Sequence, residues 1–309
     1  MSRTPAARTS AEIATQPASW RRAAEAAAGF EGLPKPGERV AVTGCGTSWF
    51  MALAYAALRE AAGQGETDAF ASSEFPAGRT YDRVVAITRS GTTTEVLDLL
   101  ERLRGRVPAT VLTADPKTPV MDAADAVAVL DWADEESVVQ TRFATTALAF
   151  LRAGLGTLTD LPGLPGLKSV EEAAVDAELA LTEPLPEAAL AAEQWTFLGR
   201  GWTYGLALEA ALKMREAAGA WTEAYPAMEY RHGPIAITGP GRVTWVFGEL
   251  PEGLAGDVAR VGGTLVSRPG TDPLADLVRA QRLAVALAES RGLDPDRPRN
   301  LTRSVILAP

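Results

Sequence analysis

The acid–base chemistry that this sequence could support is concentrated in residues 207–237. Glu209, Lys213 and Glu216 are spaced i, i+4 and i+7, which places three ionisable side chains on one face of a predicted helix. The same spacing is also typical of a solvated stripe with a glutamate–lysine pair. His232, the only histidine, precedes Gly-Pro and is predicted on a turn, where its imidazole could act as an acid or base near neutral pH.

Two glycine-bearing turns in the first half could bind an anion. They are Gly44-Cys45-Gly46-Thr47-Ser48 and Thr88-Arg89-Ser90-Gly91-Thr92-Thr93, and each stands where a strand should end and a helix begin. The free N–H groups and the dipole of a helix N-terminus favour an anion there. Uncharged hydroxyls add donors suited to a phosphomonoester; they belong to Ser48, Thr88, Ser90 and Thr93.

The second turn also has a purely structural interpretation. Thr92 could cap the following helix, with Glu95 completing a capping box and Gly91 only making the turn. Dinucleotide and P-loop interpretations fit less well, because Trp49 stands where a third glycine belongs and no G-x-x-x-x-G-K-[ST] occurs. We therefore expect no nucleotide cofactor. One cysteine and one histidine cannot supply a Cys/His zinc cluster, so no metal is expected either.

The elements that must position these residues alternate between β-branched runs and helical patterns, which is typical of βαβ units and a parallel sheet. Strands are predicted at 39–43, 83–88, 109–113, 126–130, 195–199, 243–247 and 264–266, and helices at 49–61, 94–104, 207–218 and 272–291. A proline-bearing stretch at 154–186 with one helical segment is interpreted as an interdomain connection. Each half begins with a strand, a glycine turn and a helix in corresponding positions, which suggests a duplicated α/β domain.

Composition restricts the class of protein. The 309 residues are 47% hydrophobic and 22% charged, which are ordinary globular values for about two domains. A net charge of -9 without a basic stripe argues against a nucleic-acid partner. No apolar run reaches the about 18 residues of a membrane span, and no signal peptide is recognised. The single cysteine suits a reducing compartment, so we expect a cytoplasmic protein with no membrane partner.

Four segments together resemble the sugar-isomerase (SIS) domain family, as found in the isomerase half of glucosamine-6-phosphate synthase. They are GCGTS, TRSGTTTEV, the run from FLGRGWTYG to EAYPAMEYRHGPIAI, and RPRNLTRSVIL. The resemblance runs collinearly from about Glu12 to Pro309 and is most specific in EAYPAMEYRHGP and PRNL. It implies two tandem SIS domains, each a flavodoxin-like parallel sheet between helices, at 29–165 and 188–300. Residues 1–28 would form a helical extension and 301–309 a tail that closes the site.

The resemblance also implies roles for individual residues. Glu216 falls on the base that moves the proton between C1 and C2, His232 on the ring-opening histidine, and Lys213 on a ligand position near the sugar. Glu209 is a plausible substrate-facing carboxylate. The remaining predicted substrate- and phosphate-binding residues are Gly46, Thr47, Ser48, Thr88, Arg89, Ser90, Thr93, Gln140 and Arg303. Gln140 lies in the segment 136–146, which resembles the loop that closes the first domain's site.

Two departures from the synthase pattern matter. Arg303 stands where the synthase has the lysine thought to form an imine with the ketose, and a guanidinium cannot do so, because it stays protonated. Residue 2 is Ser2 rather than the glutaminase cysteine, so we expect no production of ammonia from glutamine.

These observations predict an enzyme of the α/β class that isomerises a hexose phosphate, preferably an amino sugar phosphate, with ammonia release if the substrate carries a 2-amino group. Deglycase or epimerase chemistry on an amine-conjugated sugar is a variant of this prediction. The alternative is a non-catalytic SIS-domain sugar-phosphate sensor. By the resemblance, the protein is a homodimer in which the His232 loop reaches the partner's site.

Overall fold

The structure of the chain is a computed structural model that describes residues 6–76, 78–156, 164 and 167–307. The chain divides into two compact units. The N-sheet unit consists of Ala18–Glu135, Arg142–Glu171 and Thr302–Pro309, and the C-sheet unit consists of Met1–Pro17, Glu136–Thr141 and Glu172–Leu301. The units are therefore interleaved in sequence. The N-terminal residues up to Pro17 belong to the C-sheet unit, and the residues from Thr302 belong to the N-sheet unit. That they are two tandem SIS domains with the limits predicted above stays a prediction.

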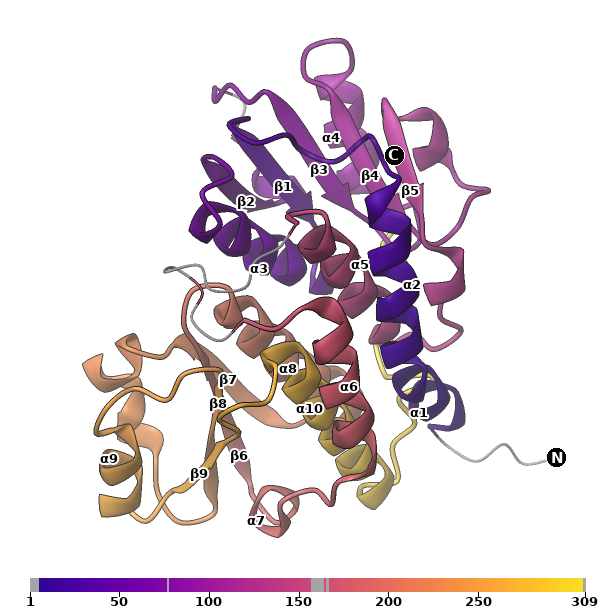
Figure 1. Ribbon diagram of the computed structural model, residues 1–309. Helices are drawn as coiled ribbons and strands as arrows, with labels where there is room; N and C mark the ends of the chain where they lie inside the picture. Colours follow the sequence, from indigo (N-terminus) through magenta and orange to yellow (C-terminus); the bar gives the residue numbers. More distant parts are fainter. Residues whose placement is uncertain (1–5, 77, 157–163, 165–166, 308–309) are drawn as a thin grey trace, which may run out of the picture. The chain divides into compact units, whose positions relative to one another are not determined.

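The N-sheet unit is built on one five-stranded parallel sheet in the order β2-β1-β3-β4-β5 (Figure 1). Its strands are β1 Val40–Gly44, β2 Thr67–Ala71, β3 Arg83–Ile87, β4 Ala109–Thr113 and β5 Ala126–Val129. The order is that of flavodoxin-like folds. Every residue of β1 and β4 is buried, as expected of central parallel strands that are covered on both faces.

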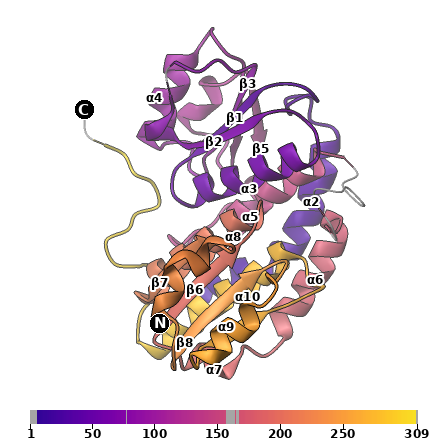
Figure 2. The same ribbon diagram turned by 90° about the vertical axis from the view of Figure 1, so that its left-hand side faces the viewer.

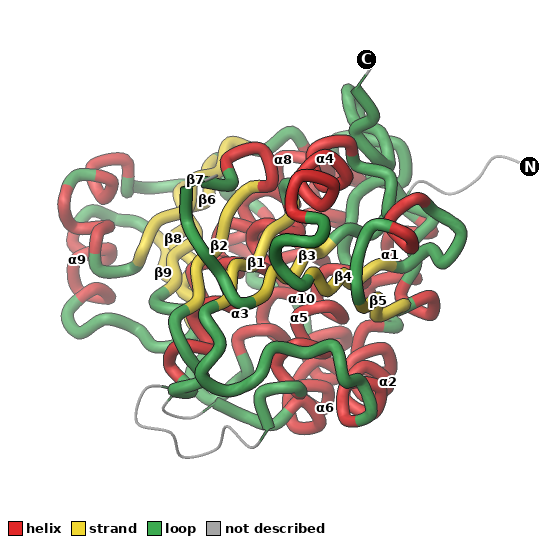
Figure 3. The backbone as a smooth tube through the Cα atoms, turned by 90° about the horizontal axis from the view of Figure 1, so that it is seen from above, coloured by secondary structure: helices red, strands yellow, loops and turns green. Residues whose placement is uncertain are grey.

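Helices cover both faces of this sheet. α3 (Thr47–Ala61) packs on β1, β2 and α5 (Arg142–Ala153). α4 (Thr94–Leu103) lies on the opposite face from α5 (Figure 3), with Val96 and Leu100 against Ala86 and Val111. The unit also contains most of α2 (Gln16–Ala28) and the 3-10 turns η1 (Ser72–Glu74), η2 (Pro119–Asp122) and η3 (Asp131–Ala133).

The C-sheet unit repeats this plan with four parallel strands in the order β7-β6-β8-β9. The strands are β6 Gln194–Gly199, β7 Trp221–Pro226, β8 Arg242–Phe247 and β9 Thr264–Ser267. α8 (Thr203–Ala218) packs on β6, β7 and α10 (Pro273–Ser290), while α9 (Leu254–Arg260) contributes Leu254 and Val258 to a cluster on the other face. Figure 2 shows α9 in front of this sheet. The unit also contains α1 (Ala7–Ala14), most of α6 (Val170–Thr182), α7 (Glu187–Leu190), η4 (Glu229–His232) and η5 (Pro234–Ile237).

The predicted parallel α/β architecture is confirmed, and all seven predicted strands are present. Two further strands, β2 and β7, are not predicted from the sequence, because they contain Asp68 and Glu223 and lack the apolar run of the other strands. The predicted loop 136–146 is shorter than expected, because α5 already begins at Arg142. Part of the predicted connection at 154–186 lies outside the described residues. No described helix has both the length and the apolar composition needed to cross a bilayer.

Candidate active site

The two predicted anion-binding turns lie at the same edge of the N-sheet unit. β1 and β3 are hydrogen-bonded parallel neighbours, so their carboxyl ends lie side by side. Gly44 ends β1 three residues before α3 begins at Thr47, and Thr88 follows directly after β3. The sheet therefore brings both turns to the position where open α/β sheets bind their ligands.

The side chains of these turns are buried rather than solvated. Exposed fractions of 3 to 8% are found for Thr47, Ser48, Thr88, Arg89 and Ser90. The Thr88 hydroxyl has no hydrogen-bond partner among the described residues. A buried hydroxyl without a partner costs free energy, and a bound ligand with acceptor oxygens would remove that cost.

The backbone of the second turn requires glycine at position 91. Gly91 has φ +63°, and a Cβ there would lie 2.1 Å from Thr118 Oγ1. The turn is tied to the neighbouring strand end by Arg89, whose carbonyl accepts hydrogen bonds from Ala114 N–H and Thr113 Oγ1. These contacts place the Ser90 hydroxyl at the start of α4.

The capping interpretation of Thr92 is wrong. The residue before α4 is Thr93, and no side chain caps the helix. Thr92 Oγ1 instead lies 3.1 Å from Ser90 Oγ, so the hydroxyls of this turn form a cluster of their own. The α4 N-terminus is therefore not occupied by the capping box that the sequence suggested.

Arg89 is a buried cation held beside the cluster. Its Nη1 lies 3.7 Å from a carboxylate oxygen of Glu135, and the two side chains are 4% and 0% exposed. Glu135 also caps α5 by accepting hydrogen bonds from the N–H groups of Arg142 (2.6 Å) and Phe143 (3.2 Å). The start of α5 thus fixes the carboxylate that positions Arg89.

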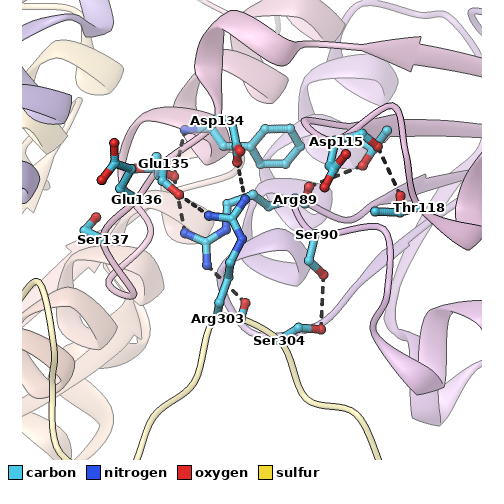
Figure 4. Close-up of polar contacts among 12 residues, drawn as sticks. Arg89, Ser90, Asp115, Thr118, Asp134, Glu135, Glu136, Ser137, Arg303 and Ser304 are labelled. Carbon is cyan, nitrogen blue, oxygen red and sulfur yellow. Dashed lines mark hydrogen bonds and ion pairs between the residues drawn. The ribbon is translucent and has the colours of Figure 1, made fainter.

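The C-terminal segment Thr302–Leu307 lies against this turn, and Figure 4 shows Arg303 and Ser304 beside Arg89 and Ser90. Arg303, predicted to bind substrate, pairs with the carboxylate of Asp134 and donates to the carbonyl of Glu135. Arg89 Nη2 donates to the carbonyl of Arg303 at 3.1 Å. Ser304 Oγ lies 3.1 Å from Ser90 Oγ and 3.0 Å from Thr92 Oγ1.

The acid–base candidates of the C-sheet unit share one face of α8, as the spacing predicts. Lys213 Nζ contacts the carboxylate of Glu216 and lies 3.5 Å from Oε1 of Glu209. The side chains of Glu209 and Lys213 are 0% and 1% exposed, whereas that of Glu216 is 18% exposed. The solvated-stripe interpretation is therefore wrong, because two of the three groups are fully buried.

Glu209 is completely buried beside Lys213. That it faces the substrate stays a prediction. A carboxylate buried beside a lysine amine fixes the position of that amine. Of the three groups, Glu216 keeps the most exposed side chain, which suits a group that exchanges protons with a ligand.

His232 ends η4 and is exposed. The residues before it anchor the segment: Tyr230 Oη lies 3.2 Å from Thr244 Oγ1, and Arg231 Nε lies 2.7 Å from a carboxylate oxygen of Asp257. Gly233 follows with φ +136°, a backbone conformation that favours glycine. The imidazole is therefore presented to solvent from a fixed turn. Nearby on β7, a hydrogen bond to Glu223 raises the pKa of Tyr225 to about 12, so this phenol stays protonated near neutral pH.

The predicted site residues thus fall into two groups. The N-sheet unit holds Gly46, Thr47, Ser48, Thr88, Arg89, Ser90, Thr93 and Arg303, and the C-sheet unit holds Gln140, Glu209, Lys213, Glu216 and His232. Gln140 is half-buried. Within the described part of the chain, no set of three or more His, Cys, Asp or Glu side chains is arranged to hold a metal ion.

Three residues that contact the second turn carry no binding role in the sequence pattern: Thr92, Glu135 and Ser304. The pattern predicts a cap at Thr92, and Ser304 lies in the segment RPRNLTRSVIL beside Arg303. Ser304 is 214 residues from Ser90, and no local pattern connects them.

Comparison with known proteins supports the resemblance. The chain is 29% identical over 300 residues to the glutamine–fructose-6-phosphate aminotransferase [isomerizing] of Sulfurisphaera tokodaii, and this alignment covers 88% of the chain and 50% of the relative. It is 32% identical over 266 residues to the enzyme of the same name from Aeropyrum pernix, and this alignment covers 72% of the chain and 43% of the relative. The chain spans about half the length of the curated relatives it matches. No protein-family model matches it.

Solved structures agree in fold. Glucosamine-6-phosphate deaminase from Thermotoga maritima superposes with a TM-score of 0.79 and 24% identity, covering 97% of this chain and 100% of that one. Tagatose-6-phosphate ketose/aldose isomerase from Escherichia coli superposes with a TM-score of 0.73 and 20% identity, and the superposition covers 99% of each chain. The chain has the fold of these two enzymes. At this identity the likeness establishes the fold.

Proposed function

We propose that the protein is a sugar-phosphate isomerase that acts on a hexose phosphate, preferably an amino sugar phosphate. The observation that carries the proposal is the trio on α8, in which a partly exposed carboxylate, Glu216, contacts the buried ammonium of Lys213. Aldose–ketose isomerisation needs one base that removes a proton from C1 or C2 and returns it to the neighbouring carbon. Relatives whose names include an isomerising activity and sugar-phosphate enzymes of the same fold support this reaction class.

In the proposed mechanism, His232 assists ring opening by moving a proton between the ring oxygen and the anomeric hydroxyl. Glu216 takes the proton from one carbon, which leaves an enediol or, for an amino sugar, an enolamine. It then returns the proton to the adjacent carbon. Lys213 stabilises the negative charge that develops on the substrate oxygen in both steps, while Glu209 holds Lys213 in place.

The phosphate is proposed to bind at the hydroxyl cluster of the N-sheet unit, with the hydroxyls of Ser48, Thr88, Ser90 and Thr93 as donors. The buried guanidinium of Arg89 supplies positive charge beside them. For a 2-amino sugar, the proton transfer from C2 to C1 forms a C2 imine, and water hydrolyses this imine to the ketose and ammonia. Deaminase and isomerase activities then differ in substrate rather than in the protein groups used.

A substrate panel tests this proposal. The protein is incubated in deuterium oxide with aldose, ketose and 2-amino hexose 6-phosphates, and NMR follows solvent deuterium at C1 and C2 while a coupled assay follows ammonia. We expect deuterium incorporation with at least one substrate, and ammonia release only from amino sugars. Binding of a hexose phosphate without any exchange would overturn the proposed reaction and favour the sugar-phosphate sensor.

A further inference from the structure

We infer that Glu12, on the buried side of α1, is a positioning residue for the segment Glu136–Thr141, called the 136–141 loop below. The inference rests on the proposed function, because this loop carries Gln140, a predicted substrate-binding residue. Glu12 has no part in the proposed proton transfers. Its carboxylate holds the loop backbone in the conformation that binds the sugar phosphate.

The first observation is the set of hydrogen bonds that the Glu12 carboxylate accepts. The residue is 6% exposed. Its Oε1 accepts from the N–H of Glu136 at 2.6 Å and from the N–H of Ser137 at 3.2 Å, and its Oε2 accepts from the Ser137 hydroxyl. One turn earlier on α1, Arg8 Nη2 lies 2.8 Å from a carboxylate oxygen of Glu136. The start of the loop is therefore attached to α1.

The type of group at position 12 matters. An apolar side chain could attach α1 at a lower cost, because a carboxylate loses its hydration when it is buried. The carboxylate instead contributes direction, since hydrogen bonds from two successive N–H groups fix the orientation of two peptide units. Hydrogen bonds to a charged acceptor are also about twice as strong as those between neutral groups. Glu12 therefore specifies one conformation of the loop backbone.

The second observation is that one residue of the C-sheet unit anchors both α1 and the loop. The Asp296 carboxylate accepts from the N–H groups of Arg8 and Thr9 at 3.1 and 2.9 Å and from Thr9 Oγ1 at 2.7 Å, so it caps the N-terminus of α1. The carbonyl of Asp296 accepts from the N–H of Val138 at 3.3 Å. Because α1 is anchored in this way, Glu12 holds the loop from a fixed support.

The third observation concerns the end of the loop. Nε2 of Gln140 is buried and has no hydrogen-bond partner among the described residues. A ligand oxygen that accepts from this amide would remove the cost of burying it unpaired. The residues that flank the loop are joined, because Glu135 accepts from the N–H of Arg142 at 2.6 Å. A short loop with joined ends has few conformations, so a backbone shift at Glu136 and Ser137 also moves Gln140.

Binding measurements on the full chain test the inference. Fructose 6-phosphate and glucosamine 6-phosphate are titrated calorimetrically into wild type, Glu12→Ala and Glu12→Gln. Removal of the carboxylate should weaken sugar-phosphate binding about tenfold or more. Glu12→Gln keeps the shape and one acceptor oxygen for the loop N–H groups, so it should weaken binding only about two- to fivefold. This second variant also tests the inference if Glu12→Ala does not fold.

Hydrogen–deuterium exchange reports on the loop itself. Exchange of a peptide that contains residues 136–141 should be faster in Glu12→Ala than in wild type, and bound sugar phosphate should slow it in wild type. Asp276→Asn is the matched control, because Asp276 is a buried carboxylate that accepts from Trp245 Nε1 at 2.8 Å and from Arg279 Nη1 at 2.9 Å. It should lower the free energy of unfolding without changing loop exchange or affinity.

A double-mutant cycle shows whether Glu12 acts through Gln140. Gln140→Ala removes the proposed amide contact, and a misplaced loop has already lost that contact. The affinity losses of Glu12→Ala and Gln140→Ala should therefore be less than multiplicative in the double variant. Multiplicative losses, or loop exchange at the wild-type rate in Glu12→Ala, would overturn the inference.

The inference and the proposed function fail differently. If wild type binds and converts a sugar phosphate and Glu12→Ala binds it equally well, the inference falls and the proposed function stands. If the variants respond as expected but no substrate exchanges its C1/C2 proton, the positioning role stands and the proposed reaction falls. If wild type binds neither sugar phosphate, both fall.

Discussion

The turn after β1 and the turn after β6 share one backbone design but carry different side chains. Gly44 and Gly199 each end a strand so close to the next helix that a Cβ would lie 2.6 Å from Ser48 Cβ and 2.2 Å from the Thr203 carbonyl oxygen, respectively. Two residues later, Gly46 and Gly201 both have φ +55°.

The hydroxyls that follow these turns are used differently. Ser48 and Thr203 hold the same position relative to the two glycines. Thr203 Oγ1 is engaged with the backbone, because it accepts from Arg200 N–H at 2.8 Å and contacts the Phe247 carbonyl at 3.0 Å. The Ser48 side chain makes no hydrogen bond with any described residue. One turn therefore keeps a hydroxyl available for a ligand, whereas the other uses it to hold the fold together.

The helices that begin after the two turns, α3 and α8, also differ in the side chains they bury. α8 carries the buried ammonium of Lys213 between two carboxylates, while α3 carries Phe50, Met51 and Ala52 inward. In the proposed function, the N-sheet unit binds the phosphate and the C-sheet unit supplies the acid–base groups. Substitutions in each unit should consequently affect different kinetic constants.

Loss of the proposed base should have the largest effect. Glu216→Gln keeps the shape of the side chain and removes its ability to accept a proton, so kcat should fall by at least about 100-fold while sugar-phosphate binding persists. Steady-state kinetics and calorimetry on the same preparation check this. Glu289→Gln, at the exposed end of α10, is the matched control. Exchange of the C1/C2 proton at the wild-type rate in Glu216→Gln would assign the proton transfer to another residue.

Removal of two anion-site hydroxyls should act on KM instead. Ser90→Ala combined with Thr93→Ala deletes contacts made equally in the ground and transition states, so KM should rise about tenfold or more while kcat changes less. Initial rates over a range of substrate concentrations separate the two constants. Unchanged affinity for hexose phosphates would remove these residues from the site.

Mixing two inactive variants tests the predicted homodimer with a shared site. If Glu216 and His232 of different chains complete one site, Glu216→Ala and His232→Ala proteins should regain about a quarter of wild-type activity after subunit exchange, because about half of the dimers are mixed and each has one intact site. Mass spectrometry verifies the exchange. Activity that stays at the level of the separate variants would place both residues in one chain's site.

The smallest effect is expected at the structural hydroxyl. Thr203→Ala leaves the backbone N–H of Arg200 and the carbonyl of Phe247 without this partner and should lower the free energy of unfolding by about 1 to 3 kcal/mol. Denaturant titration measures the loss, and KM should not change. A KM increase as large as that of the Ser90/Thr93 double variant would contradict the proposed difference between the two turns.

The sequence by itself determined the local parts of this protein. The strand–turn–helix openings and the shared face of Glu209, Lys213 and Glu216 follow from periods of 2 and 3.6 residues, which are properties of the backbone over a few turns. The parallel sheets followed from the alternation of those elements. The sequence also contained the resemblance on which the roles of Glu216 and His232 depend.

Only the tertiary structure decided which distant groups meet and which are buried. Ser304 reaches the turn at Ser90 across 214 positions of the chain, and Arg89 is positioned by Glu135 at the start of α5. Spacing placed Glu209 beside Lys213 but could not reveal its complete burial, which depends on how α8 packs against α10, β6 and β7. Such contacts depend on packing between elements far apart in the chain, whereas the periodicity of a sequence indicates only the conformation of each element by itself.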